Sequence, residues 1–347
     1  MIHEFKNLIQ EYKKANSLGL KSVMASVVSL EGSSYRRPGV RMLITENGLM
    51  FGEVSGGCVE KEILKQSTSV FKTGKPKMIT YDGRYRLGCD GIIYILIESF
   101  VPDNEMLISF ENSQKHRKSF KINSFYSKKV GIGEVWGSVI DFGNGKQFPF
   151  ANSKKPQLEN NTSTEVFSQI MKPAFRLIII GAEHDAVQLC LFASLLGWEV
   201  TVVASPSDPQ TIENFPGANE LIHILPELFQ TDFIKDNIAV VLMTHNYAKD
   251  LKFLIQLKET LPFYIGLLGS AKRRDQLLNE LIEYYPEVKD TFLDLIHGPA
   301  GINIGAETPQ EVSLSICSEI LAVTRQQDPK SLKDKTGAIH SDVILYR

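Results

Sequence analysis

A cysteine that follows two glycines is the side chain in this sequence with the clearest chemical potential. Cys58 ends the turn Ser55-Gly56-Gly57-Cys58, and a helix is predicted to begin directly after it. A helix N-terminus lowers the pKa of a nearby thiol and favours the thiolate. The alternative is a small buried hydrophobic residue. Because Cys58 lies in a glycine turn and not in an apolar stripe, we favour a functional thiol.

The other three cysteines differ in their surroundings. Cys89 lies in a second glycine-flanked turn, between Gly88 and Gly91, and either a functional or a structural role is open for it. Cys190 and Cys317 belong to apolar helical stripes, which predicts burial. No Cys-x-x-Cys pair occurs, so we predict no zinc site. A thiolate is nevertheless a soft ligand, suited to a soft metal or a sulfur-rich cofactor.

Two adjacent arginines form a second candidate site in the first half of the chain. Arg36 and Arg37 precede a Pro-Gly turn at positions 38 and 39. The planar guanidinium group binds phosphate or carboxylate oxygens in a bidentate manner. This pair therefore indicates an anion-binding loop.

In the second half, Gly181 to Ala186 follows a predicted strand and opens a helix, as a dinucleotide-binding G-x-G-x-x-G/A turn would. This turn includes His184, but Glu183 replaces the middle glycine, whose absent side chain lets backbone approach a pyrophosphate. An acidic residue directly after the next strand, which would bind the ribose, is also absent. We therefore do not expect NAD(P) binding. The domain would then keep the turn as part of its fold without binding a nucleotide there.

Further polar residues follow other predicted strands of this half. His245 comes after the strand at 238–243, and Gly269 comes after the strand at 263–268 and before a helix that carries Lys272 to Arg274. Cations and free N–H groups at a helix N-terminus suit an anion. Each side chain could equally be a solvated surface residue. Their convergence at the carboxyl edge of one sheet favours a ligand site.

A long loop at 296–307 contains glycine, proline and two polar candidates, His297 and Glu307. Loops of this length and composition are usually functional. Glu307 could instead stabilise the dipole of the following helix. That helix is predicted to begin at Thr308-Pro309, with Glu311 completing a capping box.

The elements that position these residues divide the chain into two halves. Strands predicted at 175–180, 199–203, 221–225, 238–243 and 263–268 alternate with helices, which requires a parallel sheet. We predict a Rossmann-like α/β domain at 172–326 and a tail at 327–347. The first half mixes helices at 2–16 and 59–71 with strands at 21–30, 41–45, 49–54, 77–81 and 91–100. It predicts an α+β domain at 1–150, with 101–150 as a small β appendage, and a polar linker at 151–171.

Composition limits the classes of function. The 347 residues suffice for two domains, and a net charge of −2 gives no general attraction to nucleic acid or anionic membranes. We find no secretory signal and no apolar run near the ~20 residues of a membrane helix. We therefore expect a cytoplasmic protein with reduced thiols, without nucleic acid partners or a membrane span.

These motifs together resemble the XdhC/CoxI family, the xanthine dehydrogenase accessory factors. Only 101–150 shows nothing that matches. The matching segments, in chain order, are Glu31-Gly-Ser-x-x-Arg-Arg-Pro-Gly39, Ser55-Gly-Gly-Cys58, Leu87-Gly-Cys89, Gly181-Ala-x-His-Asp-Ala186, Leu242-Met-Thr-His-Asn246, Tyr264-Ile-Gly-Leu-Leu-Gly269, His297-Gly-Pro-Ala-Gly-x-x-Ile-Gly-Ala-Glu-Thr-Pro309 and Gly337-Ala-Ile-His340.

The resemblance implies a cofactor chaperone more than an enzyme. Such proteins bind the molybdenum cofactor (molybdopterin) transiently, protect it, support its sulfuration and deliver it to an apo-molybdoenzyme of the xanthine dehydrogenase type. The resemblance further implies a cysteine desulfurase as a second partner and a homo-oligomeric state. The cofactor-binding residues that we expect are Arg36, Arg37, Ser55, Gly56, Gly57, Cys58, Cys89, Gly181, His184, His245, Gly269 and Glu307. Glu183 departs from the family's usual glycine.

Two other classes of function remain open. An NAD(P)-dependent oxidoreductase would use the Rossmann-like turn, against which Glu183 argues. A cysteine-nucleophile transferase or hydrolase would use Cys58, but no base occurs at a recognisable spacing.

Overall fold

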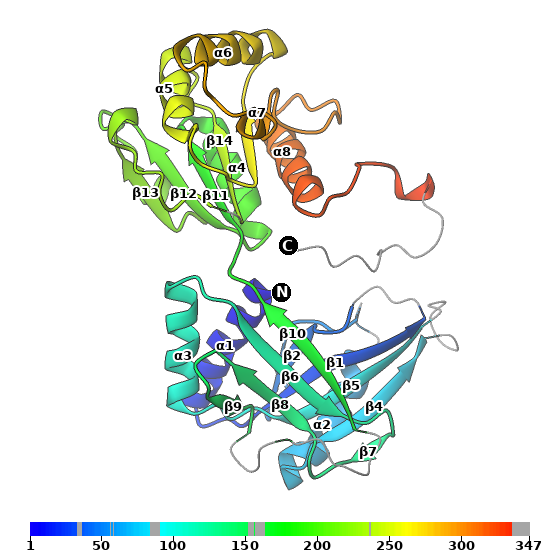
Figure 1. The fold of residues 1–347 in the computed structure, drawn as a ribbon. Helices are drawn as coiled ribbons and strands as arrows, with labels where there is room; N and C mark the ends of the chain where they lie inside the picture. The colour runs from blue at the N-terminus through cyan, green and yellow to red at the C-terminus, as the bar shows by residue number, and fades with distance from the viewer. Residues whose placement is uncertain are drawn as a thin grey trace. The chain divides into compact units, whose positions relative to one another are not determined.

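The computed structural model describes residues 1–32, 37–55, 57, 59–83, 91–151, 156, 164–235 and 237–334. The chain forms two compact units, Met1–Pro173 and Ala174–Arg347. Figure 1 shows both units, and each is described by itself below. No helix in the described part of the chain is long and apolar enough to cross a membrane.

The first unit is built on an antiparallel sheet of order β3-β2-β1-β5-β4-β7. Side chains alternate between its faces, as strand geometry requires. Val23 and Ala25 pack with helix α2 on one face, whereas Met24 packs with helix α1 on the other. The elements are α1 (Ile2–Ser17), β1 (Ser22–Gly32), β2 (Arg41–Thr45), β3 (Met50–Phe51), α2 (Glu60–Thr73), β4 (Lys77–Asp82), β5 (Gly91–Ser99) and β7 (Gly131–Ile132).

A second antiparallel sheet completes this unit, with order β10-β6-β8-β9. Its strands are β6 (Phe120–Tyr126), β8 (Gly137–Asp141), β9 (Gln147–Pro149) and β10 (Glu165–Met171), and helix α3 (Asn104–Lys115) precedes them in the chain. Residues 101–150 are therefore not a peripheral appendage. Phe110, Phe120 and Ile122 share one buried cluster with Phe5 of α1, so this region supplies half of a core.

The predicted linker at 151–171 is wrong over its last seven residues. Glu165–Met171 forms β10, which pairs with β6 along its whole length, from Glu165↔Tyr126 to Met171↔Phe120. Only two of its residues, Gln169 and Met171, are buried. The stretch that is almost free of apolar residues ends at Thr164, so the linker composition does not extend into β10, whose exposed residues include Val166 and Ile170.

The second unit has a fully parallel sheet of order β13-β12-β11-β14-β15-β16, which confirms the Rossmann-like prediction. The direction of winding reverses between β11 and β14. The strands are β11 (Arg176–Ile180), β12 (Glu199–Ala204), β13 (Glu220–His223), β14 (Ile238–Leu242), β15 (Tyr264–Leu267) and β16 (Ile296–His297). The helices are α4 (His184–Leu195), α5 (Tyr247–Leu257), α6 (Ala271–Tyr284), α7 (Asp290–Leu293) and α8 (Pro309–Thr324), with short 3₁₀ turns η2 (Ile212–Asn214), η3 (Pro226–Leu228) and η4 (Leu332–Asp334).

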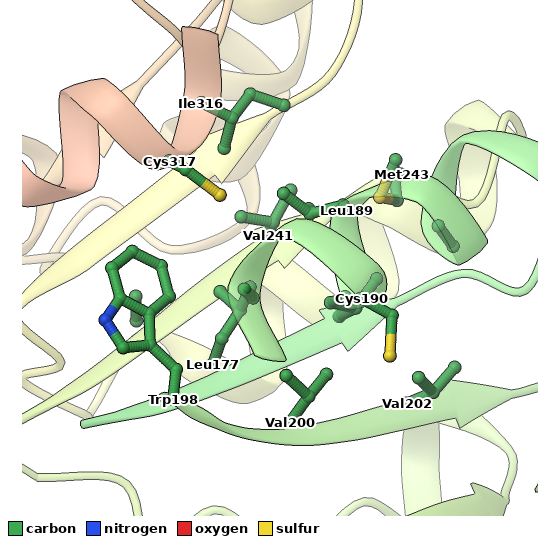
Figure 2. Packing of buried hydrophobic residues seen from close by; sticks show 14 of the residues in the cluster. Leu177, Leu189, Cys190, Trp198, Val200, Val202, Val241, Met243, Ile316 and Cys317 are labelled. Atoms are coloured by element: carbon green, nitrogen blue, oxygen red, sulfur yellow. The ribbon is translucent and has the colours of Figure 1, made fainter. Parts of the chain in front are cut away.

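Helices cover both faces of this sheet. On one face, α4 and α8 bury Cys190 and Cys317 against strand residues such as Leu177 and Val200 (Figure 2). The two cysteines are 0% and 2% exposed, and burial raises the pKa of their thiols to about 11 and about 12. Both are inert structural thiols, as the apolar stripes predicted. The α8 capping box is also confirmed, since the Thr308 side chain accepts from the Glu311 N–H at 3.3 Å.

Candidate functional site

In the first unit, a carboxylate organises the backbone around the Ser55–Cys58 turn. Glu60, the first residue of α2, accepts hydrogen bonds from the Val54 N–H (3.1 Å), the Ser55 N–H (2.7 Å) and the Ser55 hydroxyl (2.8 Å). The Val59 N–H in turn donates to the Ser55 hydroxyl oxygen at 3.3 Å. These bonds fix the chain immediately before and after residues 56–58.

Glu60 is 7% exposed, yet it holds its charge. Burial raises the pKa of its carboxyl group, but the hydrogen bonds from Ser55 and Val54 outweigh burial and leave that pKa below its ordinary value. Sequence reasoning missed this residue. The available signal was an acidic residue in the first turn of a predicted helix, five positions after a serine.

Only part of the predicted first-unit site lies among the described residues. Arg36, Gly56, Cys58 and Cys89 lie outside them. Gly57 has a φ of 109°, which favours glycine, although a Cβ there would meet nothing within 4 Å among the described atoms. Ser55 and Arg37 are half-buried.

In the second unit, Gly181 lies where the sheet reverses its winding. It has a φ of 137°, and a Cβ would lie 2.4 Å from the Met243 carbonyl oxygen, so only glycine fits against the end of β14. The Gly181 N–H donates to the Val203 carbonyl (2.9 Å), and the Met243 N–H donates to the Ile180 carbonyl (2.8 Å). The ends of β11, β12 and β14 are thereby fixed together.

An imidazole–carboxylate pair spans this reversal point. His245, three residues after the end of β14, lies 3.4 Å from the Asp185 carboxylate in the first turn of α4, measured from Nε2 to Oδ2. His245 has a φ of 53°, a left-handed conformation that is uncommon outside glycine. Such backbone strain often accompanies function. The neighbouring side chains of Glu183 and His184 are exposed.

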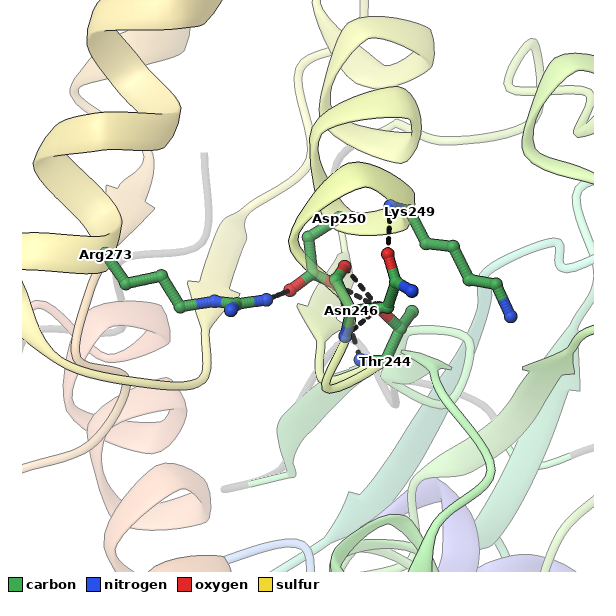
Figure 3. A network of polar contacts seen from close by, with 5 residues as sticks. All are labelled: Thr244, Asn246, Lys249, Asp250 and Arg273. Carbon is green, nitrogen blue, oxygen red and sulfur yellow. Dashed lines mark hydrogen bonds and ion pairs between the residues drawn. The ribbon is translucent and has the colours of Figure 1, made fainter.

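A buried carboxylate supports the loop that carries His245. The side chain of Asp250 is 3% exposed and bonds in two directions (Figure 3). Its Oδ1 accepts from the Thr244 hydroxyl at 2.6 Å, and its Oδ2 accepts from Arg273 Nη2 at 2.7 Å. Asn246 caps α5 by accepting from the Lys249 N–H at 3.0 Å. The loop after β14 is thus fixed to both α5 and α6.

Two of the three cations at the start of α6, Arg273 and Arg274, are bound to protein groups, which argues against the predicted anion site. Arg273 binds Asp250, and its path requires Gly269, where a Cβ would lie 2.7 Å from Arg273 Cδ. Arg274 donates to the Gly298 carbonyl at 2.6 Å and to the Asp275 carboxylate at 2.6 Å. Free guanidinium donors for a ligand are therefore fewer than the sequence suggested.

The predicted residues of the second unit are thus only partly brought together. Gly181, His245 and Gly269 lie at the carboxyl edge of the central strands, and His184 begins the adjacent helix. Glu307 is exposed before α8, where its backbone N–H donates to the Glu311 carboxylate at 2.8 Å. This edge offers imidazole and carboxylate groups held in fixed positions, the functional groups of hydrogen bonding and proton transfer.

Comparison with known proteins identifies the family. The family model described as the XdhC Rossmann domain matches residues 177–320, and the model of the XdhC and CoxI family matches residues 17–82. The chain belongs to the XdhC and CoxI family.

Relatives of this chain match it over most of its length. A Bacillus subtilis protein, named as a probable subunit of xanthine dehydrogenase, is 28% identical, over 88% of this chain and 94% of its own length. The Escherichia coli molybdenum cofactor insertion chaperone PaoD is 24% identical, over 90% of this chain and 86% of its own. A crystal structure described as a xanthine dehydrogenase from Bacillus halodurans has a TM-score of 0.75 at 27% identity, covering 92% and 96% of the two chains. The XdhC and CoxI similarity therefore includes both units.

Proposed function

We propose that this protein binds the molybdenum cofactor and takes part in its maturation, as an accessory protein of a xanthine dehydrogenase-type molybdoenzyme. The observation that carries the proposal is the similarity along 90% of the chain to a relative named as a molybdenum cofactor insertion chaperone. The similarity to a relative named after xanthine dehydrogenase supports the class of partner.

The proposed cofactor contacts in the first unit centre on Cys58, with Arg36, Arg37, Ser55, Gly56, Gly57 and Cys89 around it. A thiolate suits the sulfur-rich surroundings of molybdenum, and arginine suits the phosphate of molybdopterin. The Glu60 hydrogen bonds support this assignment because they fix the backbone on both sides of residues 56–58. In the second unit, the proposed contacts are Gly181, His184, His245, Gly269 and Glu307.

The finer steps of this role are part of the same proposal. The protein would hold the cofactor transiently, protect it, support its sulfuration with a cysteine desulfurase and deliver it to the apo-enzyme in the cytoplasm as a homo-oligomer. None of these steps requires the protein to catalyse a reaction by itself.

An NAD(P)-dependent oxidoreductase is the second candidate. The strand order and the close fit of Gly181 against β14 favour it, because both belong to dinucleotide-binding sheets. The exposed Glu183 at the N-cap of α4 opposes it, since a carboxylate there would repel a pyrophosphate. We therefore expect no productive NAD(P) binding.

One preparation tests both candidates. The full chain is purified from cells that make molybdopterin, and bound pterin is measured by fluorescence after oxidation. We expect pterin to copurify and NADH titration to give no saturable signal in the micromolar range. A protein free of pterin that binds NADH would contradict the proposed function and favour the oxidoreductase.

A further inference from the structure

A second imidazole–carboxylate pair lies at the edge of the second unit's sheet, away from the reversal point. His297 is the last residue of the edge strand β16, and Glu319 lies in α8. His297 Nδ1 is 3.2 Å from Glu319 Oε1. None of the residues proposed above as cofactor contacts belongs to this pair.

The second oxygen of Glu319 is fully engaged by other donors. Oε2 accepts from the Tyr264 hydroxyl at 2.5 Å and from the Gly301 N–H at 2.7 Å. Burial raises the pKa of Glu319, but its bonds to His297, Tyr264 and Gly301 outweigh burial and leave the pKa below its ordinary value. Burial holds the pKa of Tyr264 well above 10, so this hydroxyl stays protonated and donates. An ionised carboxylate with one oxygen left requires a donor from His297, which places the proton on Nδ1.

The ring of His297 is fixed in orientation as well as in tautomer. It stacks on the buried ring of Tyr264, with centroids 4.5 Å apart and planes inclined by 24°. Gly266 makes space for this stack, because a Cβ there would lie 2.9 Å from Tyr264 Cε1. The side chain of His297 is still 29% exposed. No hydrogen bond to its Nε2 is found among the residues that the structure describes.

The loop after His297 is equally constrained. The Ala300 N–H donates to the Leu267 carbonyl at 3.0 Å, and the Ser315 hydroxyl donates to the Ile302 carbonyl at 2.6 Å. Arg274 donates to the Gly298 carbonyl at 2.6 Å, which adds a guanidinium group beside the histidine. This surrounding shell keeps the imidazole in one position before any ligand arrives, as binding sites require.

We propose that His297 is a ligand-binding residue: Glu319 fixes its Nδ1–H, and its exposed Nε2 accepts a hydrogen bond from an N–H group of a pterin-type heterocycle. The identity of the ligand rests on the proposed function. The orientation of the histidine rests on its contacts with Glu319 and Tyr264 and does not depend on the proposed function.

Two substitutions separate binding from structural support. In His297→Asn, the amide can still donate to Glu319 from near the Nδ1 position, but nothing replaces Nε2. In Tyr264→Phe, one donor to Glu319 is lost while His297 keeps both nitrogens. If the pair only attached α8 to the sheet, His297→Asn would behave as the wild type and Tyr264→Phe would be the more damaging change.

Binding is measured by isothermal titration calorimetry, with pterin-6-carboxylate added to the purified full chain. We expect His297→Asn to weaken affinity about tenfold, the loss of one hydrogen bond to a well-oriented group, and Tyr264→Phe to weaken it by less than about threefold. Equal affinity of His297→Asn and wild type, or no binding of the free pterin by the wild type, would overturn the assignment. Copurification of the cellular cofactor is read separately, so its absence contradicts the proposed function and not the role of His297.

Labelling by diethylpyrocarbonate supplies an independent measurement, since this reagent modifies neutral, accessible imidazole nitrogens. Mass spectrometry should find His297 labelled in the free protein and protected about fivefold or more by saturating pterin-6-carboxylate. Exposed His223, at the end of β13 and outside the proposed contacts, serves as the internal control for overall reactivity. If His297 were unreactive without pterin, or equally reactive with and without it, the proposal that its Nε2 is accessible and binds the ligand would be refuted.

Discussion

Glu98 is a buried acid in the first unit whose charge state should change near neutral pH. It lies in β5, is 2% exposed, and accepts from the Ser138 hydroxyl (2.6 Å) and the Ser138 N–H (2.8 Å). Burial raises the pKa of this carboxyl group to about 7, although Ser138 and the charge of Arg41 act in the opposite direction. The ordinary pKa of a glutamate side chain, which we take for the unfolded chain, is 4.5.

A raised folded pKa makes stability fall as pH rises. Below pH 4.5 the carboxyl group is protonated in the folded and the unfolded chain, so its ionisation does not affect the free energy of unfolding. Between pH 4.5 and about 7 it ionises only in the unfolded chain, which lowers that free energy as pH rises. Above pH 7 it is ionised in both states, and the free energy of unfolding falls no further. The side chain in Glu98→Gln cannot ionise. Between pH 5 and pH 8 the free energy of unfolding of the wild type should therefore fall by on the order of 1–3 kcal/mol relative to that of Glu98→Gln. Urea unfolding followed by Trp136 fluorescence in a Trp198→Phe background measures the difference. The exposed Glu111→Gln is the control, and a pH-independent gap for Glu98→Gln would contradict the prediction.

Cys58 carries the most specific functional prediction at the scale of single residues. Cys58→Ala should reduce activation of a partner molybdoenzyme at least tenfold, because it removes the proposed thiolate contact with the cofactor. Cys190→Ala, which removes a buried thiol in the other unit, should leave activation nearly unchanged. Activation is measured as xanthine oxidation after coexpression with the apo-enzyme. Full activation by Cys58→Ala, with the variant folded by circular dichroism, would refute the thiolate role.

At the scale of elements, the buried carboxylate of Asp250 in α5 connects the loop after β14 to α6. Asp250→Ala would leave the guanidinium of Arg273 and the hydroxyl of Thr244 without their partner, and we expect it to cost about 2–3 kcal/mol of unfolding free energy. Asp185→Asn breaks a solvent-exposed pair and should cost less than about 1 kcal/mol. Urea unfolding followed by Trp198 fluorescence in a Trp136→Phe background compares them. Similar costs for both changes would show that Asp250 does not hold these elements together.

Elements with strong local patterns could be predicted from sequence. The apolar strand β11, strand β2 and the capping box of α8 all lie where they were expected. Helix α3 was missed because it buries only three residues, and β10 because it buries only two of its seven. In the candidate sites, Gly181 and His245 follow from strand ends, but the partners of Glu60, Asp250 and Glu319 do not. Arg273 finds Asp250 on another helix, a pairing that only tertiary structure creates.

At the scale of the whole molecule, β10 decides where the first unit ends. It covers the edge of β6, and its Gln169 side chain accepts a hydrogen bond from the buried Arg41. Arg41 is 6% exposed, and its Nε and Nη2 have no hydrogen-bond partner among the described residues. Without Gln169, its one remaining hydrogen bond among the described residues would be to the Gly39 carbonyl, 2.9 Å from Nη1. A buried guanidinium with so few partners is costly.

The fragment 1–173 should therefore fold by itself, whereas 1–150, the boundary that composition alone suggested, should not. The shorter fragment loses a full edge strand, the partner of Arg41 and the contact of Phe167 with the cluster beside Trp136. We expect a cooperative urea transition of Trp136 fluorescence for 1–173 and none, or one at least about 3 kcal/mol weaker, for 1–150. The fragment 174–334, whose sheet is covered on both faces by its own helices, is the control that should fold in either case. If 1–150 were as stable as 1–173, β10 would be a dispensable edge and the first unit would end before it.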